Sequence, residues 1–393
     1  MLLRKDTSLR LMIAAQLALA AYYASRILRG ERFTYNDFLS FYAGGSIVRD
    51  GQGGRLYDLG VQVVYQAKAF GLESSDSRFG LLPFVNPPHA ALMLTPLAYL
   101  SPKAAASVYL VLNCLIAAWI LRRLWLLAAG WSRGEQILLV TTTLATEVLW
   151  YSLETGTMTL LGFLFLIEYY LAMRAGRNSR AAVWLIAATI KPQLILLPAL
   201  IPLAQRRWRL VVMALALGFL VGLGISLGFG FHIWADYYRL LRQVGAHGEA
   251  YGALPMLMDN LRMILYWTVT PAVVMPLVFL ALLAGGISVF WMWRSGRDFD
   301  LRFALTVLLG LFLAPHLNYQ DTLIAILPAA LGYDFARRKG GRLVVFQVFM
   351  LTATFLPAAL IFTGYFPMLQ LIWPVPLIVG LAAVCAFSLR KRA

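Results

Sequence analysis

The sequence predicts an all-α polytopic membrane protein that forms one integral membrane domain over residues 1–393. Three observations lead to this fold class: 61% of the residues are hydrophobic, only 13% are charged, and long apolar runs recur along the whole chain. A soluble domain carries about 25% charged residues. Helices are expected rather than barrel strands, because barrel strands would show alternating apolar and polar residues.

The positive charge of the chain has a regular distribution. The net charge is +16, and most basic residues lie in short links between apolar segments or at the termini. They cluster at 4–10, 122–133, 174–180, 206–209, 294–302, 337–342 and 390–392. This is the positive-inside pattern of cytoplasmic links. The excess charge therefore indicates anionic lipid headgroups rather than a nucleic acid as its partner.

Placing every basic cluster in the cytoplasm fixes a path through the membrane. It contains about eight full spans of roughly 20 residues each. The first, 9–28, is too long for a signal-peptide core and is expected to be retained. The spans are predicted over 9–28, 103–121, 134–151, 156–173, 209–230, 269–293, 343–362 and 367–389. Two long loops, 29–87 and 231–268, then lie outside, and the first contains interfacial helices.

Two segments are predicted to be short helical hairpins. Segment 181–204 begins and ends at basic clusters, yet it is too short to cross the membrane twice. Its tip is expected at Lys191-Pro192, because proline breaks a helix. Segment 302–336 repeats the arrangement, with HLNYQD at 316–321 as its tip. Stretch 87–100 is predicted to be a short helix that dips into the membrane from outside.

Several classes of chemistry are excluded by what the sequence lacks. It has no Walker loop, no nucleotide-binding fingerprint and no histidine or cysteine cluster of metal-ligand spacing. No cofactor is therefore expected, although a divalent cation is left open. Cys114 and Cys385 lie in apolar segments and are interpreted as packing residues. Any chemistry is expected to use the outer loops and the hairpin tips, without ATP.

Asp37 stands among aromatic residues in RFTYNDFLSFYAGG, directly after the first span. One interpretation is a surface carboxylate on an interfacial helix whose aromatic residues anchor it at headgroup level. The other is a general base whose pKa is raised by apolar neighbours. Glu154 also has two interpretations. It could be a charge that caps the N-terminus of the next helix, or it could be a site residue.

Lys191 is a cation within an apolar segment and therefore needs an anion or a watery cavity. A structural ion pair with Glu154 or Glu168 is one interpretation, and a ligand for phosphate is the other. The second hairpin tip is dense in polar groups, which indicates either a hydrogen-bonded turn or the lining of a site. These groups are His316, Asn318, Tyr319 and Asp321.

Five stretches together resemble glycosyltransferase family 87, a branch of the GT-C superfamily that includes polyprenol-phosphate-mannose-dependent mannosyltransferases. The resemblance covers about residues 30–335. It is carried by NDFLSFYAGG, GGRLYDLG at 53–60, FVNPPHAALMLTPLAYL at 84–100, ATIKPQLILLPALIPL at 188–203 and APHLNYQDTLIAILPA at 314–329. Two departures from the family pattern bear on the sugar or acceptor: Asn86 replaces an aromatic residue, and residues 156–159 read GTMT.

The resemblance implies a GT-C-like bundle and an inverting transfer, with a polyprenyl-phosphate sugar as donor, mannose first among the hexoses. Asp37 would be the catalytic base, and the acceptor would be a lipid or glycan hydroxyl on the outer face of the plasma (inner) membrane. The expected substrate-binding residues are Lys191, His316, Glu154, Asn318, Tyr319, Asp321, Asp58, Asn86 and Arg262. The alternative function is a transporter or flippase for an amphipathic lipid-linked substrate, which would share the hairpins and buried charges.

Overall fold

The structure is a computed structural model that describes residues 5–29, 36–71, 80–246, 258, 260–294 and 298–338. Every regular element in these ranges is a helix, which confirms the all-α prediction. The predicted spans 343–362 and 367–389 lie outside the described residues. So does the middle of the second predicted outer loop.

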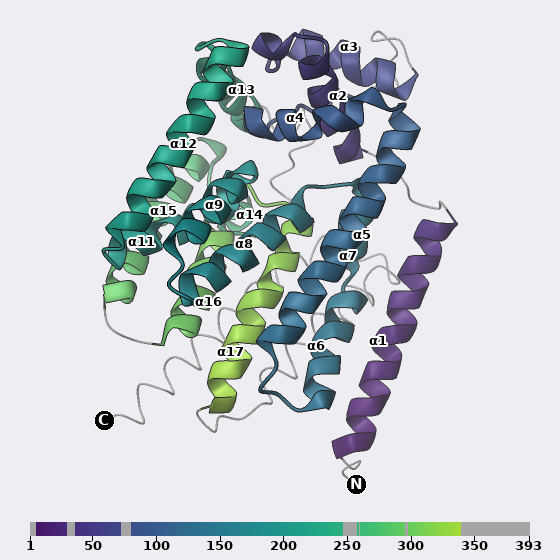
Figure 1. Cartoon of the computed structure of the whole chain (residues 1–393), viewed down its shortest axis with the longest axis vertical. Helices are drawn as coiled ribbons and strands as arrows, with labels where there is room; N and C mark the ends of the chain where they lie inside the picture. The colour runs from purple at the N-terminus through teal and green to yellow at the C-terminus, as the bar shows by residue number, and fades with distance from the viewer. Residues whose placement is uncertain are drawn as a thin grey trace.

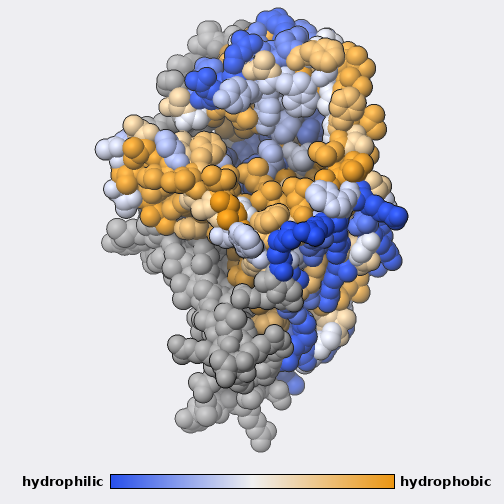
Figure 2. Space-filling view, turned by 90° about the vertical axis from the view of Figure 1, so that its left-hand side faces the viewer, coloured by the Kyte–Doolittle hydropathy of each residue, from blue (hydrophilic) through white to orange (hydrophobic). Residues whose placement is uncertain are grey.

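In the described part of the chain, four helices are long and apolar enough to cross a membrane. At 1.5 Å per residue, 22 residues already extend about 33 Å, slightly more than the hydrocarbon core. Most of their apolar side chains face outward, as lipid-facing residues do. On the face in Figure 2, hydrophobic residues form a band at mid-height, hydrophilic residues gather at the top and at the lower right, and the surface is hollowed just above the band. The four helices are α1 (Lys5–Leu28), α5 (Pro102–Leu127), α12 (Trp208–Phe229) and α15 (Pro271–Arg294).

Shorter helices fill the space between these four. They are α6 (Arg133–Ala145), α7 (Glu147–Thr155), α8 (Thr159–Arg174), α16 (Phe299–Leu313) and α17 (Ile326–Arg338). The single span predicted over 134–151 is wrong, because the helix stops at Thr146, whose backbone is extended with ψ of 127°. The Trp150 indole N–H donates to the Leu144 carbonyl at 2.6 Å and so satisfies one group that the break exposes.

Both predicted hairpins are interrupted where the sequence places their tips. The first consists of α9 (Asn178–Ala187), η3 (Ala188–Ile190), α10 (Pro192–Ile195), η4 (Pro198–Leu200) and α11 (Ile201–Ala204). Lys191 lies between η3 and α10 with φ −125° and ψ 78°, because a residue before proline is driven out of the helical region. In the second, non-helical residues 314–318 and η7 (Tyr319–Ala325) separate α16 from α17.

A group of short helices, which we name the cap, covers one end of the molecule. It comprises α2 (Asn36–Arg49), η1 (Gly53–Arg55), α3 (Leu59–Phe70), α4 (Pro88–Leu94), η2 (Thr95–Tyr99) and α13 (Ile233–Ala246). The first residues of α1 and the end of α17 lie at the opposite end (Figure 1). The helix predicted over 87–100 is therefore α4 and η2, and both pack against α2.

The aromatic residues of α2 do not anchor it to headgroups, contrary to that interpretation of the sequence. Phe38, Phe41 and Tyr42 are buried in a hydrophobic core, against Phe84 and Tyr109. The ring centroids of Phe38 and Tyr109 are 5.1 Å apart. Protein side chains rather than lipid thus surround the start of α2, and they fix the position of Asp37.

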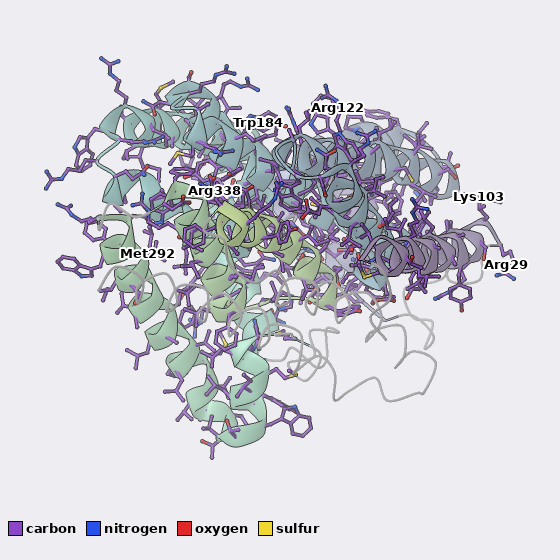
Figure 3. The ribbon with its side chains drawn as sticks, turned by 90° about the horizontal axis from the view of Figure 1, so that it is seen from below. Arg29, Lys103, Arg122, Trp184, Met292 and Arg338 are labelled. Atoms are coloured by element: carbon purple, nitrogen blue, oxygen red, sulfur yellow. The ribbon has the colours of Figure 1, made fainter. Side chains whose placement is uncertain are left out.

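Opposite the cap, Arg338 ties the ends of α16 and α17 together. Its guanidinium forms ion pairs with Asp334 at 2.9 Å, Asp298 at 3.1 Å and Asp300 at 3.4 Å. Seen from below, Arg338 lies at the end of α17, near the middle of the helices (Figure 3). These ion pairs join the two helices of the second hairpin at the end away from its tip. They therefore help to fix the position of η7.

Candidate active site

The site is built around η7, the short helix at the tip of the second hairpin. Asn318 precedes it as N-cap, and the Asn318 backbone N–H donates to Asp321 Oδ2 at 3.3 Å. Asp321 is fully buried, whereas Asn318 and Tyr319 are half-buried. This cap holds the Asp321 carboxylate in one orientation and leaves its other oxygen, Oδ1, for a second partner.

That partner is Lys191, from the tip of the first hairpin. Lys191 Nζ forms an ion pair with Asp321 Oδ1 and also donates to Thr159 Oγ1 at 2.9 Å. The Thr159 hydroxyl in turn donates to Asp321 Oδ1 at 2.6 Å. All three side chains are buried. Lys191 is therefore ion-paired, as one interpretation of the sequence expects, but its partner is neither Glu154 nor Glu168.

Asp37 lies beside this pair, on the second residue of α2. Its carboxylate Oδ2 accepts a hydrogen bond from Gln320 Nε2 at 3.3 Å. Burial raises the pKa of Asp37 to about 6, the Lys191 charge opposes the rise, and the Asp321 charge adds to it. The carboxylate is thus ionised at neutral pH and is a stronger base than an exposed aspartate.

His316 and Arg262 extend the polar cluster at the same hairpin tip. Arg262, on α14 (Leu261–Thr268), is buried and donates from Nη1 to the Pro315 carbonyl at 3.1 Å. Its buried Nε–H has no hydrogen-bond partner among the described residues. Burial lowers the pKa of His316 to about 4, so its imidazole is neutral at pH 7.

Two tyrosines from different helices form an aromatic edge near Asp37. Tyr151 on α7 and Tyr319 on η7 meet edge to face, with ring centroids 6.0 Å apart, and both are half-buried. Tyr151 lies close enough to Asp37 for the two groups to interact electrostatically. Aromatic faces of this kind suit the C–H faces of a sugar as well as apolar chains.

The structure does not bring Asp58 into this cluster. Asp58 is exposed in the cap, where its Oδ1 accepts from the backbone N–H groups of Gly60 and Val61 at 2.9 and 3.2 Å. It also pairs with Arg55 at 2.9 Å. These bonds lower its pKa and identify it as the N-cap of α3.

Asn86 makes hydrogen bonds through both its side chain and its backbone. Its Nδ2 donates to the Ile190 carbonyl at 3.0 Å, and its own backbone carbonyl accepts from the Tyr57 hydroxyl at 2.8 Å. Asn86 therefore joins the cap to the residue that directly precedes Lys191.

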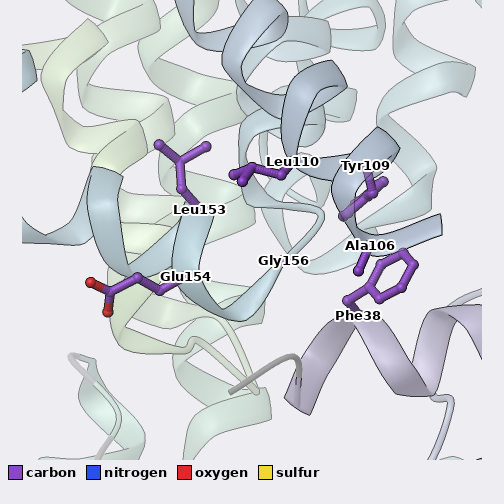
Figure 4. A pocket seen from close by; sticks show the side chains of 7 residues that line it. All are labelled: Phe38, Ala106, Tyr109, Leu110, Leu153, Glu154 and Gly156. Carbon is purple, nitrogen blue, oxygen red and sulfur yellow. The ribbon is translucent and has the colours of Figure 1, made fainter. Parts of the chain in front are cut away.

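Glu154 is also separate from the cluster. It sits in the last turn of α7, as expected, but the N-cap of the next helix, α8, is Met158 and has no side-chain cap. Glu154 instead pairs with Arg26 of α1 at 3.6 Å. Its carboxylate points away from Phe38 and Gly156 (Figure 4). The small, largely apolar pocket in that view lies between α2, α5 and α7. It is lined by Phe38, Ala106, Tyr109, Leu110, Leu153, Glu154 and Gly156.

Sequence reasoning missed Thr159, Gln320 and Tyr151. Thr159 belongs to the GTMT stretch that departs from the family pattern, so that departure was the available signal. Gln320 stands between two predicted site residues, but a neutral amide needs no counter-ion and so does not predict a charged partner. Tyr151 is one of many aromatic residues, and only the bend at Thr146 turns α7 toward the cluster. Within the described residues, no three His, Cys, Asp or Glu side chains are arranged to hold a metal ion.

The model of glycosyltransferase family 87 matches residues 84–315, which is more than half of the chain. The chain belongs to glycosyltransferase family 87. The matched region of this family 87 protein includes Thr159, Lys191 and Arg262. It excludes Asp37 and the stretch from His316 onward, although the expected resemblance extended over 30–335. Neither curated proteins nor solved structures give a significant match.

Two conclusions follow from this membership and from the fold. The protein is a membrane glycosyltransferase, and it acts on a sugar donor and an acceptor. The contacts of Lys191 with Asp321, and of Asp37 with Gln320, tie residues outside the matched region to the same cluster as the residues inside it.

Proposed function

We propose that this protein transfers a hexose, mannose first, from a polyprenyl-phosphate donor to a lipid or glycan hydroxyl outside the plasma membrane. The sequence has no nucleotide-binding motif, which favours a lipid-linked donor over a nucleotide sugar. The basic links favour a cytoplasmic location for the end opposite the cap. The polar cluster lies toward the cap, so its substrates would approach from the outer leaflet.

The observation that carries the proposal is a half-buried carboxylate with a raised pKa beside a buried lysine. Asp37 would accept the proton of the acceptor hydroxyl while that oxygen bonds to the anomeric carbon of the sugar. The bond from this carbon to the phosphate oxygen breaks on the opposite face, and its electron pair leaves with the polyprenyl phosphate. The configuration at the carbon is inverted, and the proton remains on Asp37 until solvent removes it. A base of this kind typically contributes about 10²–10⁴-fold to the rate.

The cationic and N–H groups around Lys191 suit the charge that grows on the leaving phosphate. Lys191 is one, and Arg262 offers its unpaired Nε–H, which has no partner among the described residues. His316 is neutral and would donate a single N–H rather than a charge. Donors fixed before the reaction stabilise a developing anion most strongly in a site that excludes water. Asn318, Tyr319 and Asp321 would complete the wall of this subsite.

Donor binding would change the surroundings of Lys191. In the structure its charge is compensated by Asp321, so the donor phosphate would share or replace that contact. Asp321 is then the counter-ion that keeps Lys191 charged and oriented while the site is empty. This role is supported by the complete burial of Asp321 and by its cap at Asn318.

The test is an assay of the purified protein with polyprenyl-phosphate mannose and membrane lipid extract. Asp37→Asn keeps the size of the side chain but cannot accept a proton. We expect turnover to fall by at least about a hundredfold, while donor binding changes little. Near-normal turnover of Asp37→Asn would overturn the proposed mechanism. Movement of the donor across vesicles without product formation would favour the transporter alternative.

A further inference from the structure

The contact between Gln320 and Asp37 joins the second hairpin tip to the first helix of the cap. The two residues are 283 positions apart in the sequence, and Gln320 is 5% exposed. An ionised carboxylate has only acceptor atoms, so the amide must present its N–H₂ group to Asp37. Of the described side chains, Gln320 alone hydrogen bonds to the Asp37 carboxylate.

We propose that Gln320 is a positioning residue, which orients the Asp37 carboxylate so that Oδ1 faces the acceptor hydroxyl. This inference rests on the proposed function, in which Asp37 is the base. A carboxylate on a short side chain can rotate about its terminal bond. One directed hydrogen bond to Oδ2 restricts that rotation. Rates respond strongly to displacements of about 1 Å in groups of this kind.

Gln320 lies on η7 next to Asp321, so this short helix contacts both Asp37 and Lys191. The next residue, Asp321, holds Lys191, so one turn of helix carries the contacts to both the base and the cation. Any shift of η7 would therefore move the acceptor side and the donor side together. Thr322 helps to keep this turn in place, because its hydroxyl donates to the Tyr319 carbonyl at 2.7 Å.

Within the described residues, the charged and titratable groups that act on Asp37 come from four parts of the fold. Lys191 lies at the first hairpin tip, Asp321 on η7, Tyr109 on α5 and Tyr151 on α7. Gln320 carries no charge and leaves this set unchanged. Its hydrogen bond favours the ionised form of Asp37, so its removal should raise the pKa of the carboxylate.

The experiment compares Gln320→Leu with Thr322→Val in the purified enzyme, by kcat over pH 5–9 and by donor affinity. Thr322 is buried on the same turn and its hydroxyl bonds to a backbone carbonyl, so Thr322→Val controls for a general disturbance of η7. For Gln320→Leu we expect kcat to fall by about tenfold to a hundredfold. We also expect the acid limb, the decline of kcat at low pH, to move to higher pH. Donor affinity should stay within about twofold, and Thr322→Val should leave the acid limb in place.

Gln320→Glu provides a variant of the same shape in case the leucine variant does not fold. A second carboxylate beside Asp37 should share one proton with it over an intermediate range of pH, in which the protonated group donates to the ionised one. We therefore expect kcat to be highest in that intermediate range and to fall at lower pH, where both groups are protonated.

Two results would overturn the inference. Gln320→Leu could keep its kcat and its acid limb, or Thr322→Val could shift the limb equally. If Asp37→Asn is inactive while Gln320→Leu behaves as wild type, only the role of Gln320 is wrong. An active Asp37→Asn would instead remove the proposed function itself.

Discussion

Lys191 Nζ and Asp321 Oδ1 form a buried ion pair that links the tips of two separate hairpins. Asp321 is fully buried and Lys191 is 7% exposed. Thr159 Oγ1 bridges them, 2.9 Å from Lys191 Nζ and 2.6 Å from Asp321 Oδ1. A buried pair of this kind is costly to break from one side, because the remaining charge is left without compensation.

Removing one partner should therefore destabilise the protein as well as inactivate it. Lys191→Ala or Asp321→Ala alone should each cost about 3–5 kcal/mol of stability. Lys191→Ala/Asp321→Ala should be more stable than either single variant, because no charge is left unpaired. Thermal unfolding in detergent measures these differences. Lys191→Arg should keep the fold and part of the activity, since the charge remains while its geometry changes.

The double variant separates the structural role from the role in donor binding. It should stay inactive and bind polyprenyl phosphate weakly even though its stability has recovered. Activity that recovered together with stability would contradict a phosphate contact by Lys191.

Gly156 allows α2 to pack closely against the end of α7. Its φ is +69°, and a Cβ placed there would lie 2.7 Å from the Cβ of Phe38, the neighbour of Asp37. Gly156→Ala should lower both stability and kcat, because it combines backbone strain with displacement of α2. Gly176 has the same φ of +69° with nothing within 4 Å. Gly176→Ala should therefore lower stability by the strain alone and leave kcat unchanged.

The activity should depend on pH through Asp37. Burial raises the pKa of this carboxylate to about 6, and only the ionised form can accept a proton. We expect kcat to be constant above pH 7 and to fall about tenfold per pH unit well below pH 6. His316 adds no step in this range, because burial lowers its pKa to about 4. A profile that stays flat down to pH 5 would contradict Asp37 as the base.

Asp58 should contribute to stability without contributing to catalysis. Its side chain caps α3 in the exposed part of the cap, and loss of such a cap typically costs about 1 kcal/mol. Asp58→Ala should thus lower the melting temperature slightly and keep kcat and both KM values. Asp58→Asn should restore most of the stability. A large loss of turnover in Asp58→Ala would show that this residue belongs to the site.

The orientation in the membrane is tested by cysteine labelling of intact cells. Lys68→Cys on α3 and Tyr238→Cys on α13 place thiols on exposed positions of the cap. Both should react with a membrane-impermeant maleimide when Cys114 and Cys385 are replaced by serine. Ser179→Cys, in a basic link, should react only after the cells are lysed. Labelling of Ser179→Cys alone in intact cells would reverse the orientation.

The sequence was sufficient for the fold class and for both hairpin tips, since hydropathy and proline act locally. The break at Thr146 was missed because threonine and alanine are compatible with either a span or a bend. It depends on Trp150, whose indole bonds to the freed Leu144 carbonyl. That Lys191 has a buried partner was predictable, because a buried charge requires one.

The sequence did not predict that Asp321 is the ion-pair partner of Lys191. Glu168 is taken by Arg123 and by the Trp119 indole at 3.1 Å, and Glu154 is taken by Arg26. These pairings depend on how α1, α5 and α8 pack, and sequence spacing says nothing about that. Asp58, like Asp37, is an aspartate in the first predicted outer loop, yet its carboxylate caps the helix that follows it. Gln320 had no signal at all, because neutral amides are common in turns.

The separation of Asp37 and Gln320 by 283 residues has a consequence for biogenesis. At 5–20 residues per second, a ribosome needs roughly 15 to 60 seconds to pass from one residue to the other. During that time the first helices are already in the bilayer, where the proposed function places the lipid-linked substrates. Gln320 and Asp321 are made last among the residues of the cluster, so in the proposed mechanism the nascent chain would be inert until the second hairpin is inserted. We expect a chain that ends before that hairpin to have no transferase activity.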